Sequence, residues 1–396
     1  MGGETRWGRD PLNQQSGTTN SFRRVVIPGL QLPGPPLKLT VNEQLPIRGR
    51  GAAGNPTNRF ESIHLERDVD WNPEEDPAPT THFLKDSTRT IINYNDSPDI
   101  GFNASINPYR GCEHGCIYCY ARPTHEYLGF SAGLDFESKI MVKENAPELL
   151  RKELASPKWK PQVIALSGVT DCYQPVERKL KLTRRCLEVL AEFRNPVAIV
   201  TKNHLVTRDI DVLSELARHR AVVVFISLTT LDSTLTPKLE PRASLPKHRL
   251  AAIQMLSQAG VPVGALLAPI MPALNDHEIP SLIAAATAAG AKYLGYVPLR
   301  LPFGVGELFE SWLTQHFPER KEKVLNRIRA LRGGRLNDPN FGTRMRGEGN
   351  LADQIEALFS VASRKAGLEG KRPELSIEAF RVPASTTEHK QKIFPF

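Results

Sequence analysis

The sequence predicts an α/β fold built around a partial (β/α)6 barrel. Six short β-rich apolar runs alternate with amphipathic helical stretches, at a repeat of about 25–40 residues from the second run on. Continuous apolar strands indicate burial on both faces, as in a parallel sheet. Strand–helix alternation of this kind indicates βαβ units. Six such units favour a curved, open sheet over a closed eight-fold barrel.

The expected strands cover residues 98–107, 162–168, 196–201, 221–228, 261–268 and 292–298. The expected helices between them cover residues 144–156, 176–194, 207–219, 246–259 and 276–289. Asn275, with Glu278 three residues on, predicts a capping box at the start of the last of these helices. Sites in such folds lie at the C-terminal ends of the strands, which here are rich in polar and charged residues.

Three regions are expected along the chain. Residues 1–80 predict an irregular, flexible extension, residues 81–300 the barrel core, and residues 301–396 a helical part that packs on the core. The helices of this last part are expected at residues 306–316, 318–332 and 350–366, with an Arg-rich loop at 342–349.

Charge changes sign within the N-terminal extension. Residues 1–60 hold eight basic and three acidic residues, whereas residues 61–80 hold one basic and seven acidic residues. The basic segment 48–59 could follow a phosphate backbone, or it could be a solvated tail. The net charge of +8 permits an anionic partner such as nucleic acid but does not require one.

Composition excludes several classes of protein. With 40% hydrophobic and 24% charged residues, the chain resembles an ordinary soluble protein rather than a coiled coil or a low-complexity chain. No apolar run approaches the ~18 residues of a transmembrane helix, and the first residues lack the apolar stretch of a secretory signal. We therefore expect a cytoplasmic protein without a membrane partner.

Three of the five cysteines form a C-x3-C-x2-C run, Cys112-Glu-His-Gly-Cys116-Ile-Tyr-Cys119. Chance is a poor explanation for this spacing, and the glycines at 111 and 115 let the backbone turn tightly enough to bring three thiols together. Three thiols cannot all pair as disulfides. A structural zinc ion would need a fourth ligand, which His114 or His125 could supply.

A four-cysteine iron–sulfur site would need Cys172 or Cys186 as its fourth ligand. Cys186 falls on the apolar face of a helix and is expected in the core, whereas Cys172 follows the second strand on the same rim as the motif. His114 is expected to be a solvated spacer. The remaining option is a [4Fe–4S] cluster with three protein ligands and one open iron.

The motif resembles the signature of the radical S-adenosylmethionine (SAM) superfamily. The wider string from Asn107 to Arg122, Asn-Pro-Tyr-Arg-Gly-Cys-Glu-His-Gly-Cys-Ile-Tyr-Cys-Tyr-Ala-Arg, resembles the branch related to spore photoproduct lyase, and within it bacterial proteins labelled "DNA repair photolyase". Matching strings are Thr170-Asp-Cys-Tyr-Gln-Pro175, Thr201-Lys-Asn-His204 and Glu240-Pro-Arg242. The resemblance covers roughly residues 45–385.

The resemblance implies a cofactor set and a site. Cys112, Cys116 and Cys119 would hold a [4Fe–4S] cluster, and SAM would occupy the fourth iron. One electron, from a reductant such as flavodoxin or ferredoxin, would break SAM into methionine and a 5′-deoxyadenosyl radical. Candidate SAM-binding residues at the rim are Tyr118, Ser167, Gly168, Thr170, Lys202, Ser227, Arg242 and Ala268. Arg242 could instead hold a substrate phosphate, or pair with Glu240 or Asp232.

The lyase branch returns a hydrogen atom to its product radical from a cysteine near the second strand. Cys172 is the nearest candidate here for that catalytic role, and without it thymine-dimer splitting does not follow. The leading hypothesis is therefore a radical SAM enzyme of unassigned substrate, with nucleic-acid repair or modification as its narrower form. The alternative is a non-catalytic protein in which zinc or an iron–sulfur cluster is structural.

Overall fold

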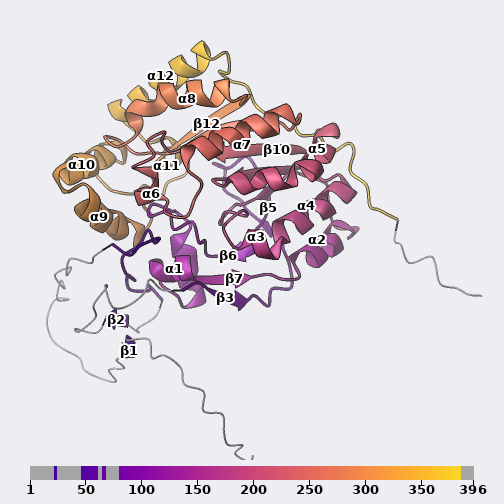
Figure 1. The fold of residues 1–396 in the computed structure, drawn as a ribbon, viewed down its shortest axis with the longest axis horizontal. Coiled ribbons are helices and arrows are strands. Elements are labelled where there is room, and N and C mark those ends of the chain that lie inside the picture. Colours follow the sequence, from indigo (N-terminus) through magenta and orange to yellow (C-terminus); the bar gives the residue numbers. More distant parts are fainter. Residues whose placement is uncertain (1–21, 25–45, 61–64, 68–79, 385–396) are drawn as a thin grey trace, which may run out of the picture.

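The computed structural model of the chain describes residues 22–24, 46–60, 65–67 and 80–384. Its main sheet has seven strands in the order β12-β11-β10-β9-β8-β5-β4. Six of them run parallel, and β4 (Ile92–Tyr94) joins β5 antiparallel at one edge. Within the described residues β4 and β12 do not pair, so the sheet stays open and the predicted partial (β/α)6 barrel is confirmed (Figure 1).

The six parallel strands lie where the apolar runs predict them. They are β5 (Ala104–Ile106), β8 (Ile164–Leu166), β9 (Val197–Thr201), β10 (Val222–Ser227), β11 (Val263–Ile270) and β12 (Tyr293–Pro298). Most of their residues are buried, because helices cover the outer face and side chains fill the inner one. This burial explains why the runs are continuously apolar rather than alternating.

Helices connect the strands and cover the outer face of the sheet (Figure 1). They are α2 (Ala146–Leu154), α4 (Leu182–Phe193), α5 (Ile210–Arg218), α7 (Pro246–Gln258) and α8 (Ile279–Ala288). Short 3-10 turns precede two of them, η2 (His204–Asp209) before α5 and η3 (Asp276–Glu278) before α8.

The single helix expected over residues 176–194 is two helices. The first, α3 (Glu177–Leu180), ends at Lys181, whose φ is +52°, and α4 begins directly after it. The buried carboxylate of Glu177 accepts hydrogen bonds from the backbone N–H of Thr183 at 3.0 Å and of Arg184 at 3.4 Å. The Glu177 side chain thus satisfies N–H groups in the first turn of α4, which stabilises the break.

The capping box predicted at Asn275 is wrong. The Asn275 side chain makes no cap hydrogen bond; it accepts from the Met271 N–H at 2.6 Å and donates to the carbonyl of Thr229 at 2.7 Å. Glu278 accepts from Thr230 Oγ1 and the Leu231 N–H. Both side chains join the loops that follow β10 and β11, which a local motif cannot reveal because the partners are distant in sequence.

A second sheet and two short helices, none of them predicted from the sequence, surround the cysteine motif. The strands β3 (His82–Lys85), β7 (Lys139–Val142) and β6 (Tyr109–Arg110) pair in that order. The 3-10 helix η1 (Arg122–Leu128) and helix α1 (Leu134–Ser138) follow the motif along the chain. These elements are short and half-polar, so their hydrophobic pattern is weak.

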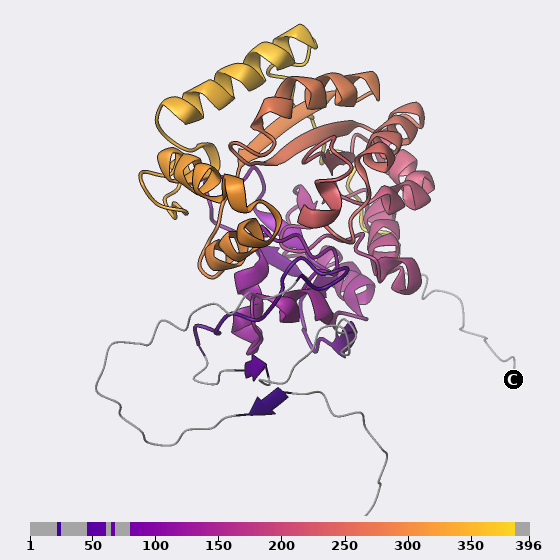
Figure 2. The same cartoon turned by 60° about the vertical axis from the view of Figure 1, so that its left-hand side comes forward.

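The C-terminal part is helical, as predicted. It contains α9 (Val305–His316), α10 (Lys321–Leu331), the one-turn α11 (Thr343–Arg346) and α12 (Asn350–Lys365). Helix α12 lies along α8 (Figure 2). It also contacts β12, where the ring of Tyr296 lies 4.6 Å from the ring of Phe359 on α12. Helices α9 and α10 share a hydrophobic cluster with Cys116, Ile117 and Tyr118 of the motif.

The N-terminal segment 46–60 packs against the core. Ala52 is 1% exposed, and a Cβ on Gly51 would lie 1.7 Å from the carbonyl oxygen of Gly115. The expected solvated tail is therefore wrong for these residues, although most of the predicted flexible extension lies outside the described residues. The short strand β1 (Phe22–Arg24) pairs antiparallel with β2 (Leu65–Arg67). No helix in the described part of the chain is long and apolar enough to cross a membrane.

Candidate functional site

The cysteine motif forms a buried loop directly after β6. Cys112 and Cys116 are each 7% exposed, and Cys119 is half-buried. Gly111 and Gly115 have φ angles of +79° and +67°, and a Cβ on either would come within 3 Å of a neighbouring side chain. Only glycine satisfies both the left-handed backbone and the close contact at these positions. The expected tight turns are therefore present.

A buried ion pair, Arg122–Glu137, holds this loop. Both side chains are fully buried, and the Arg122 guanidinium donates to the carbonyls of Cys116 at 3.0 Å and Gly115 at 3.3 Å. The Glu137 carboxylate also accepts the backbone N–H groups of Gly51 and Ala52, each at 2.9 Å. One ion pair thus joins the cysteine loop, α1 and the N-terminal segment, and its hydrogen bonds compensate the cost of burying two charges.

Glu113 and His114, which lie between the first two cysteines, are buried rather than solvated. Glu113 accepts from the Val176 N–H at 2.7 Å, while its own N–H donates to Gln174 Oε1 at 2.9 Å. His114 is 1% exposed, with Nδ1 3.3 Å from Asp171 Oδ2 and Nε2 3.2 Å from Asn203 Nδ2. The expectation of a solvated His114 is wrong, because the loop turns it inward against the ends of β8 and β9.

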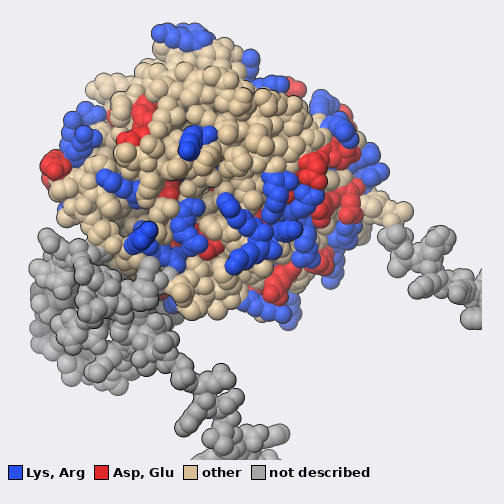
Figure 3. Space-filling model, in the orientation of Figure 1, with Lys and Arg blue, Asp and Glu red and all other residues tan. Residues whose placement is uncertain are grey.

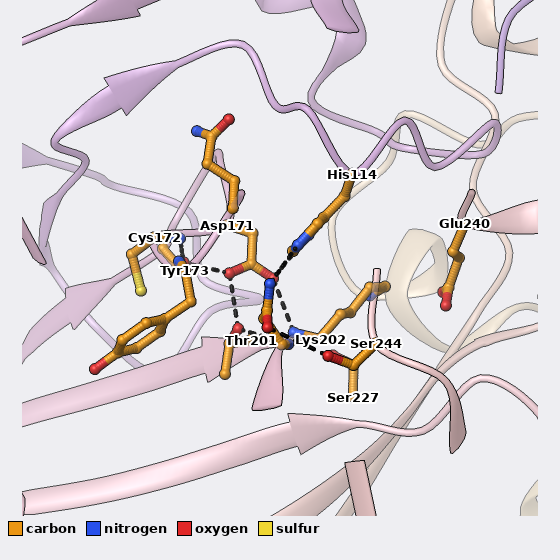
Figure 4. A network of polar contacts seen from close by, with 12 residues as sticks. His114, Asp171, Cys172, Tyr173, Thr201, Lys202, Ser227, Glu240 and Ser244 are labelled. Atoms are coloured by element: carbon orange, nitrogen blue, oxygen red, sulfur yellow. Dashed lines mark hydrogen bonds and ion pairs between the residues drawn. The ribbon is translucent and has the colours of Figure 1, made fainter. Parts of the chain in front are cut away.

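Asp171 is the centre of a polar network at the strand ends (Figure 4). Its carboxylate accepts from Thr201 Oγ1 at 2.7 Å and from the Lys202 N–H at 2.8 Å, and it faces His114. Burial alone would raise the pKa of Asp171, but His114 and these donors lower it to about 2. Burial opposes the charge on His114, yet Asp171 and Cys112 raise the pKa of His114 to about 10. The network ties the cysteine loop to two strand ends.

A second network surrounds Tyr118, which is 7% exposed. Its hydroxyl donates to the buried carboxylate of Glu240, which also accepts from Thr229 Oγ1 at 2.6 Å and pairs with Arg249. Burial raises the pKa of Tyr118, and the negative charge of Glu240 adds to that effect. Tyr118 therefore donates a hydrogen bond as a neutral phenol.

Lys202 lies between the two networks. Its Nζ is 5.9 Å from the centre of the Tyr118 ring, and Figure 4 shows its side chain on the same side of the site as Glu240. Burial raises the pKa of Glu240, but the positive charges of Arg249 and, to a smaller extent, Lys202 lower it to about 2. Burial also raises the pKa of Cys116, and the charge of Lys202 offsets part of that rise. No direct ion pair of Lys202 is present within the described residues. This cation faces the motif and is available to an anionic ligand.

The other predicted rim residues take different positions. Ser167, with φ +85°, accepts the Cys172 N–H at 2.7 Å; the Gly168 carbonyl accepts the Tyr120 hydroxyl at 2.8 Å. Thr170 Oγ1 donates to the carbonyl of Tyr109 at 3.0 Å. Ser227 and Ala268 reach the site through backbone carbonyls, which accept from Arg249 and Thr229. All of them lie at or just beyond the C-terminal ends of β8, β10 and β11.

Arg242 pairs with neither of its expected partners. Its guanidinium lies 2.9 Å from Glu113 Oε1 and donates to Thr81 Oγ1 at 3.2 Å. Glu240 is occupied by Arg249, which comes from α7. Arg242 thus contacts the cysteine loop through Glu113, and its binding of a ligand stays a prediction.

Cys172 and Cys186 are both fully buried in the main hydrophobic core. This confirms the expectation for Cys186. The Cys172 N–H and carbonyl are held by Ser167 and Thr183, and in Figure 4 its sulfur points away from the Asp171 carboxylate. A hydrogen donor must reach the substrate radical, so this burial argues against the catalytic role predicted for Cys172.

Most of the arginines expected to follow a phosphate backbone already have protein partners. Arg59 pairs with Glu126 at 2.6 Å, and Arg50 donates to the Glu137 carbonyl at 2.8 Å. In the loop 342–349, Arg344 pairs with Asp99 and Arg346 with Glu356. Arg48 is exposed. Neutralising Arg50 and Arg59 would therefore test the fold as much as nucleic-acid binding.

The donor set fits an iron–sulfur cluster by its chemistry. Three cysteines stand within one eight-residue loop, in which Cys112 and Cys116 are buried and Cys119 is half-buried. Burial and Glu240 are the larger causes of the raised pKa of Cys116, so the free thiol is protonated and metal binding must displace protons. Among the described residues, no three His, Cys, Asp or Glu side chains are arranged around a single-ion site.

Comparisons with known proteins agree with this geometry. Residues 106–286 match the family model of the radical SAM superfamily. An uncharacterised protein of Mycobacterium tuberculosis is 36% identical over 248 residues, which cover 62% of this chain and 72% of the relative. An uncharacterised protein of Methanocaldococcus jannaschii is 30% identical over 222 residues, which cover 56% of this chain and 79% of the relative.

Solved structures show the same fold. Spore photoproduct lyase complexed with a dinucleoside spore photoproduct superposes with a TM-score of 0.53 at 16% identity, covering 72% of this chain and 79% of that chain. A doubly substituted variant of that lyase with bound SAM and the dinucleoside gives a TM-score of 0.51 at 16% identity, covering 72% and 78%. The chain therefore belongs to the radical SAM superfamily, whose cofactors are a [4Fe–4S] cluster and SAM.

Sequence reasoning missed the residues that position the site. Arg122 and Glu137 bind the loop, Asp171 joins it to β8 and β9, and Arg249 holds Glu240. Asp171 and Glu240 stood inside strings that resemble the lyase branch, so a signal existed for them. Glu137 and Arg249 lie in ordinary amphipathic contexts, and only the fold shows that their charges are buried.

Proposed function

We propose that Cys112, Cys116 and Cys119 hold the [4Fe–4S] cluster and that the chain cleaves SAM reductively beside it. The cluster, when bound, supplies the electron that breaks SAM into methionine and a 5′-deoxyadenosyl radical. The observation that carries this proposal is the buried three-cysteine loop, fixed by Arg122–Glu137 and lying against the polar ends of the parallel strands of the open sheet.

The residues of the chain orient SAM in this account. The ammonium group of Lys202 lies beside the motif and suits the carboxylate of SAM, since it lacks a direct ion pair within the described residues. Tyr118 presents an aromatic face for the adenine while its hydroxyl is fixed by Glu240. Ser227 ends β10 and Thr170 follows β8, so they lie on either side of β9. The hydrophobic cluster of α9 and α10 excludes water behind Cys116.

The substrate stays a prediction. The lyases of similar fold bind a dinucleoside lesion, and nucleic-acid repair or modification is the corresponding prediction for this chain. Arg50, Arg59, Arg344 and Arg346 do not support it, because each already has a protein partner. A structural zinc or iron–sulfur protein is the competing function, and it predicts no response of the metal site to SAM.

Anaerobic reconstitution with iron and sulfide tests the proposal. The wild type should bind a full cluster, and its electron paramagnetic resonance spectrum after reduction should change when SAM is added. Cys112→Ala, Cys116→Ala and Cys119→Ala should each lose the cluster. Cys186→Ala is the matched control, because this cysteine lies in the core, and it should retain it.

Lys202→Met separates binding of SAM from binding of the cluster. The variant should hold the same iron content as the wild type but need at least about tenfold more SAM for the spectral change, because a buried charge-assisted contact contributes roughly 1.5–3 kcal/mol. Uptake of zinc in place of iron, or a cluster whose spectrum ignores SAM, would contradict the proposal.

A further inference from the structure

Unpaired cations gather on one surface beside the cysteine loop. We call it the basic surface; its members are exposed and come from α3, the residue after it, and the start of α7, namely Arg178, Lys179, Lys181 and Lys247. Figure 3 shows Lys and Arg side chains concentrated over the region that Figure 1 labels α3. None of these four side chains forms an ion pair with another described residue, whereas Arg151, Arg184 and Arg185 nearby all do.

The elements of the basic surface are held together. Arg208 of η2 donates to the Glu177 carbonyl at 3.0 Å and pairs with the Glu177 carboxylate at 2.7 Å, which joins η2 to α3. The His204 ring of η2 lies 6.2 Å from the His248 ring of α7. Three carboxylates lie beneath the surface: Glu177 and Asp209 are fully buried and Glu113 is 3% exposed. The exposed carboxylates nearby, Glu148, Glu188 and Asp211, each pair with an arginine outside the basic surface, so its cations stay unpaired among the described residues.

The basic surface backs directly onto the cysteine loop. Val176, the residue before α3, donates its N–H to Glu113, the neighbour of Cys112. Asn203, the residue before η2, contacts His114, which lies between Cys112 and Cys116. The basic surface is therefore connected to the cysteine loop by two contacts, one through Val176 and one through Asn203.

The route between this surface and the motif is closed to a substrate. Glu113 and His114 fill it and are 3% and 1% exposed. The candidate SAM ligands Tyr118 and Lys202 belong to the networks on the inner side of the loop. A molecule bound on the basic surface could pass an electron through the buried loop, but it could not bring an atom to SAM.

We propose that the basic surface docks an acidic one-electron carrier protein of the flavodoxin or ferredoxin class, which reduces the cluster. The inference rests on the proposed function, since it presupposes the cluster in the cysteine loop. The transfer balances: the carrier is oxidised by one electron and the cluster is reduced by one, with no bond formed or broken. Complementary charge speeds encounter and fixes orientation, and salt weakens it.

The test compares two variants of equal charge change. One carries Arg178→Glu, Lys179→Glu, Lys181→Glu and Lys247→Glu on the basic surface. The control carries Lys323→Glu, Lys365→Glu, Lys371→Glu and Arg372→Glu, which are exposed cations of the C-terminal part without an ion pair to another described residue. Binding of flavodoxin and of a plant-type ferredoxin to the reconstituted full chain is measured at low and high salt.

The wild type and the control variant should bind at least one carrier at low salt, and high salt should abolish the binding. The basic-surface variant should bind at least about tenfold more weakly. Its 5′-deoxyadenosine yield should fall with the carrier and its reductase but stay at the wild-type level with dithionite, a small reductant that needs no docking.

Three results would overturn the proposal. One is that neither carrier binds the wild type in a salt-dependent way. Another is that the control variant loses binding as much as the basic-surface variant. The third is that the basic-surface variant loses binding of an oligonucleotide while keeping the carrier, which would assign the surface to nucleic acid. A wild type that makes no 5′-deoxyadenosine even with dithionite would instead contradict the proposed function, and the binding data would stand apart from it.

Discussion

Single residues fix the geometry of the cysteine loop through charges that are fully buried. Arg122 and Glu137 have no exposed side-chain surface, and between them they bind carbonyls and N–H groups of three separate segments. The motif could be read from the sequence because its spacing is local. The ion pair that supports the motif could not be predicted from the sequence, because Glu137 is one of many acidic residues and only long-range contacts distinguish it.

Glu137→Gln tests this pair. Removing one charge leaves the Arg122 guanidinium buried without its counter-ion, which should cost about 3–5 kcal/mol of unfolding free energy and reduce the iron bound. The control is Glu188→Gln, whose side chain is 45% exposed beside Arg184 and should cost less than about 1 kcal/mol. Urea unfolding and iron analysis measure both; equal small losses would show that the pair does not hold the loop.

Cys172→Ala distinguishes a core cysteine from a hydrogen donor. Since Cys172 is fully buried in the main core, the variant should lose about 1–2 kcal/mol of stability yet keep its iron and its yield of 5′-deoxyadenosine. Chemical unfolding and a product assay measure the two effects. A stable variant whose substrate product changes would restore the catalytic role.

His125 should make the protein sensitive to mild acid. Burial, opposed by the carbonyl of Lys139, lowers the pKa of His125 to about 4, against 6.5 when unfolded. The folded state therefore binds fewer protons in this window, so stability is complete above pH 6.5 and falls as the pH drops toward 4. Between pH 7 and pH 5 the loss should be about 2 kcal/mol. Urea unfolding measures the free energy of unfolding at pH 7 and pH 5. The loss between the two pH values should be about 2 kcal/mol smaller in His125→Phe than in the wild type. An equal loss in both proteins would contradict the account.

At the scale of elements, the strands and long helices follow the hydrophobic pattern, while the short elements around the site do not. Five of the six parallel strands begin and end within two residues of their expected bounds, whereas β5 begins six residues later than expected. The sheet β3-β7-β6 and the segment 46–60 carry weak patterns and depend on contacts with the loop. The site thus lies where sequence pattern is least informative.

Gly51→Ala tests whether segment 46–60 belongs to the folded core. Its Cβ would lie 1.7 Å from the Gly115 carbonyl oxygen, so the segment must move, and we expect a loss above about 4 kcal/mol with loss of iron. Gly49→Ala is the control: its φ is +73°, but a Cβ there meets nothing within 4 Å, so the cost should be about 1–2 kcal/mol. If thermal unfolding showed the same loss of stability in both variants, segment 46–60 would not pack against the core as described.

Helix α9 should support the cysteine loop from behind. Trp312 is 1% exposed, shares a cluster with Cys116 and Tyr118, and donates to the Lys238 carbonyl at 2.9 Å. Trp312→Ala should cost about 3–5 kcal/mol and lower the cluster occupancy. Leu358→Ala on α12, where the side chain is 39% exposed, should stay within about 0.5 kcal/mol. Full iron content in Trp312→Ala would show that α9 is not needed by the site.

At the scale of the molecule, an open parallel sheet gathers distant residues at one edge. The motif after β6, Asp171 after β8, Lys202 after β9 and Glu240 after β10 meet there, although they span 129 positions of the chain. The sequence predicted this meeting because parallel strands end at a common edge. It did not predict which side chains bind one another, since pairing at the edge depends on the loops.

The release of 5′-deoxyadenosine tests the central claim most directly. The reconstituted wild type and Cys116→Ala are incubated anaerobically with dithionite and SAM, and the product is quantified by chromatography. The account predicts 5′-deoxyadenosine from the wild type and none above background from the variant. A wild type that holds a full cluster, binds SAM and still releases no 5′-deoxyadenosine would contradict it.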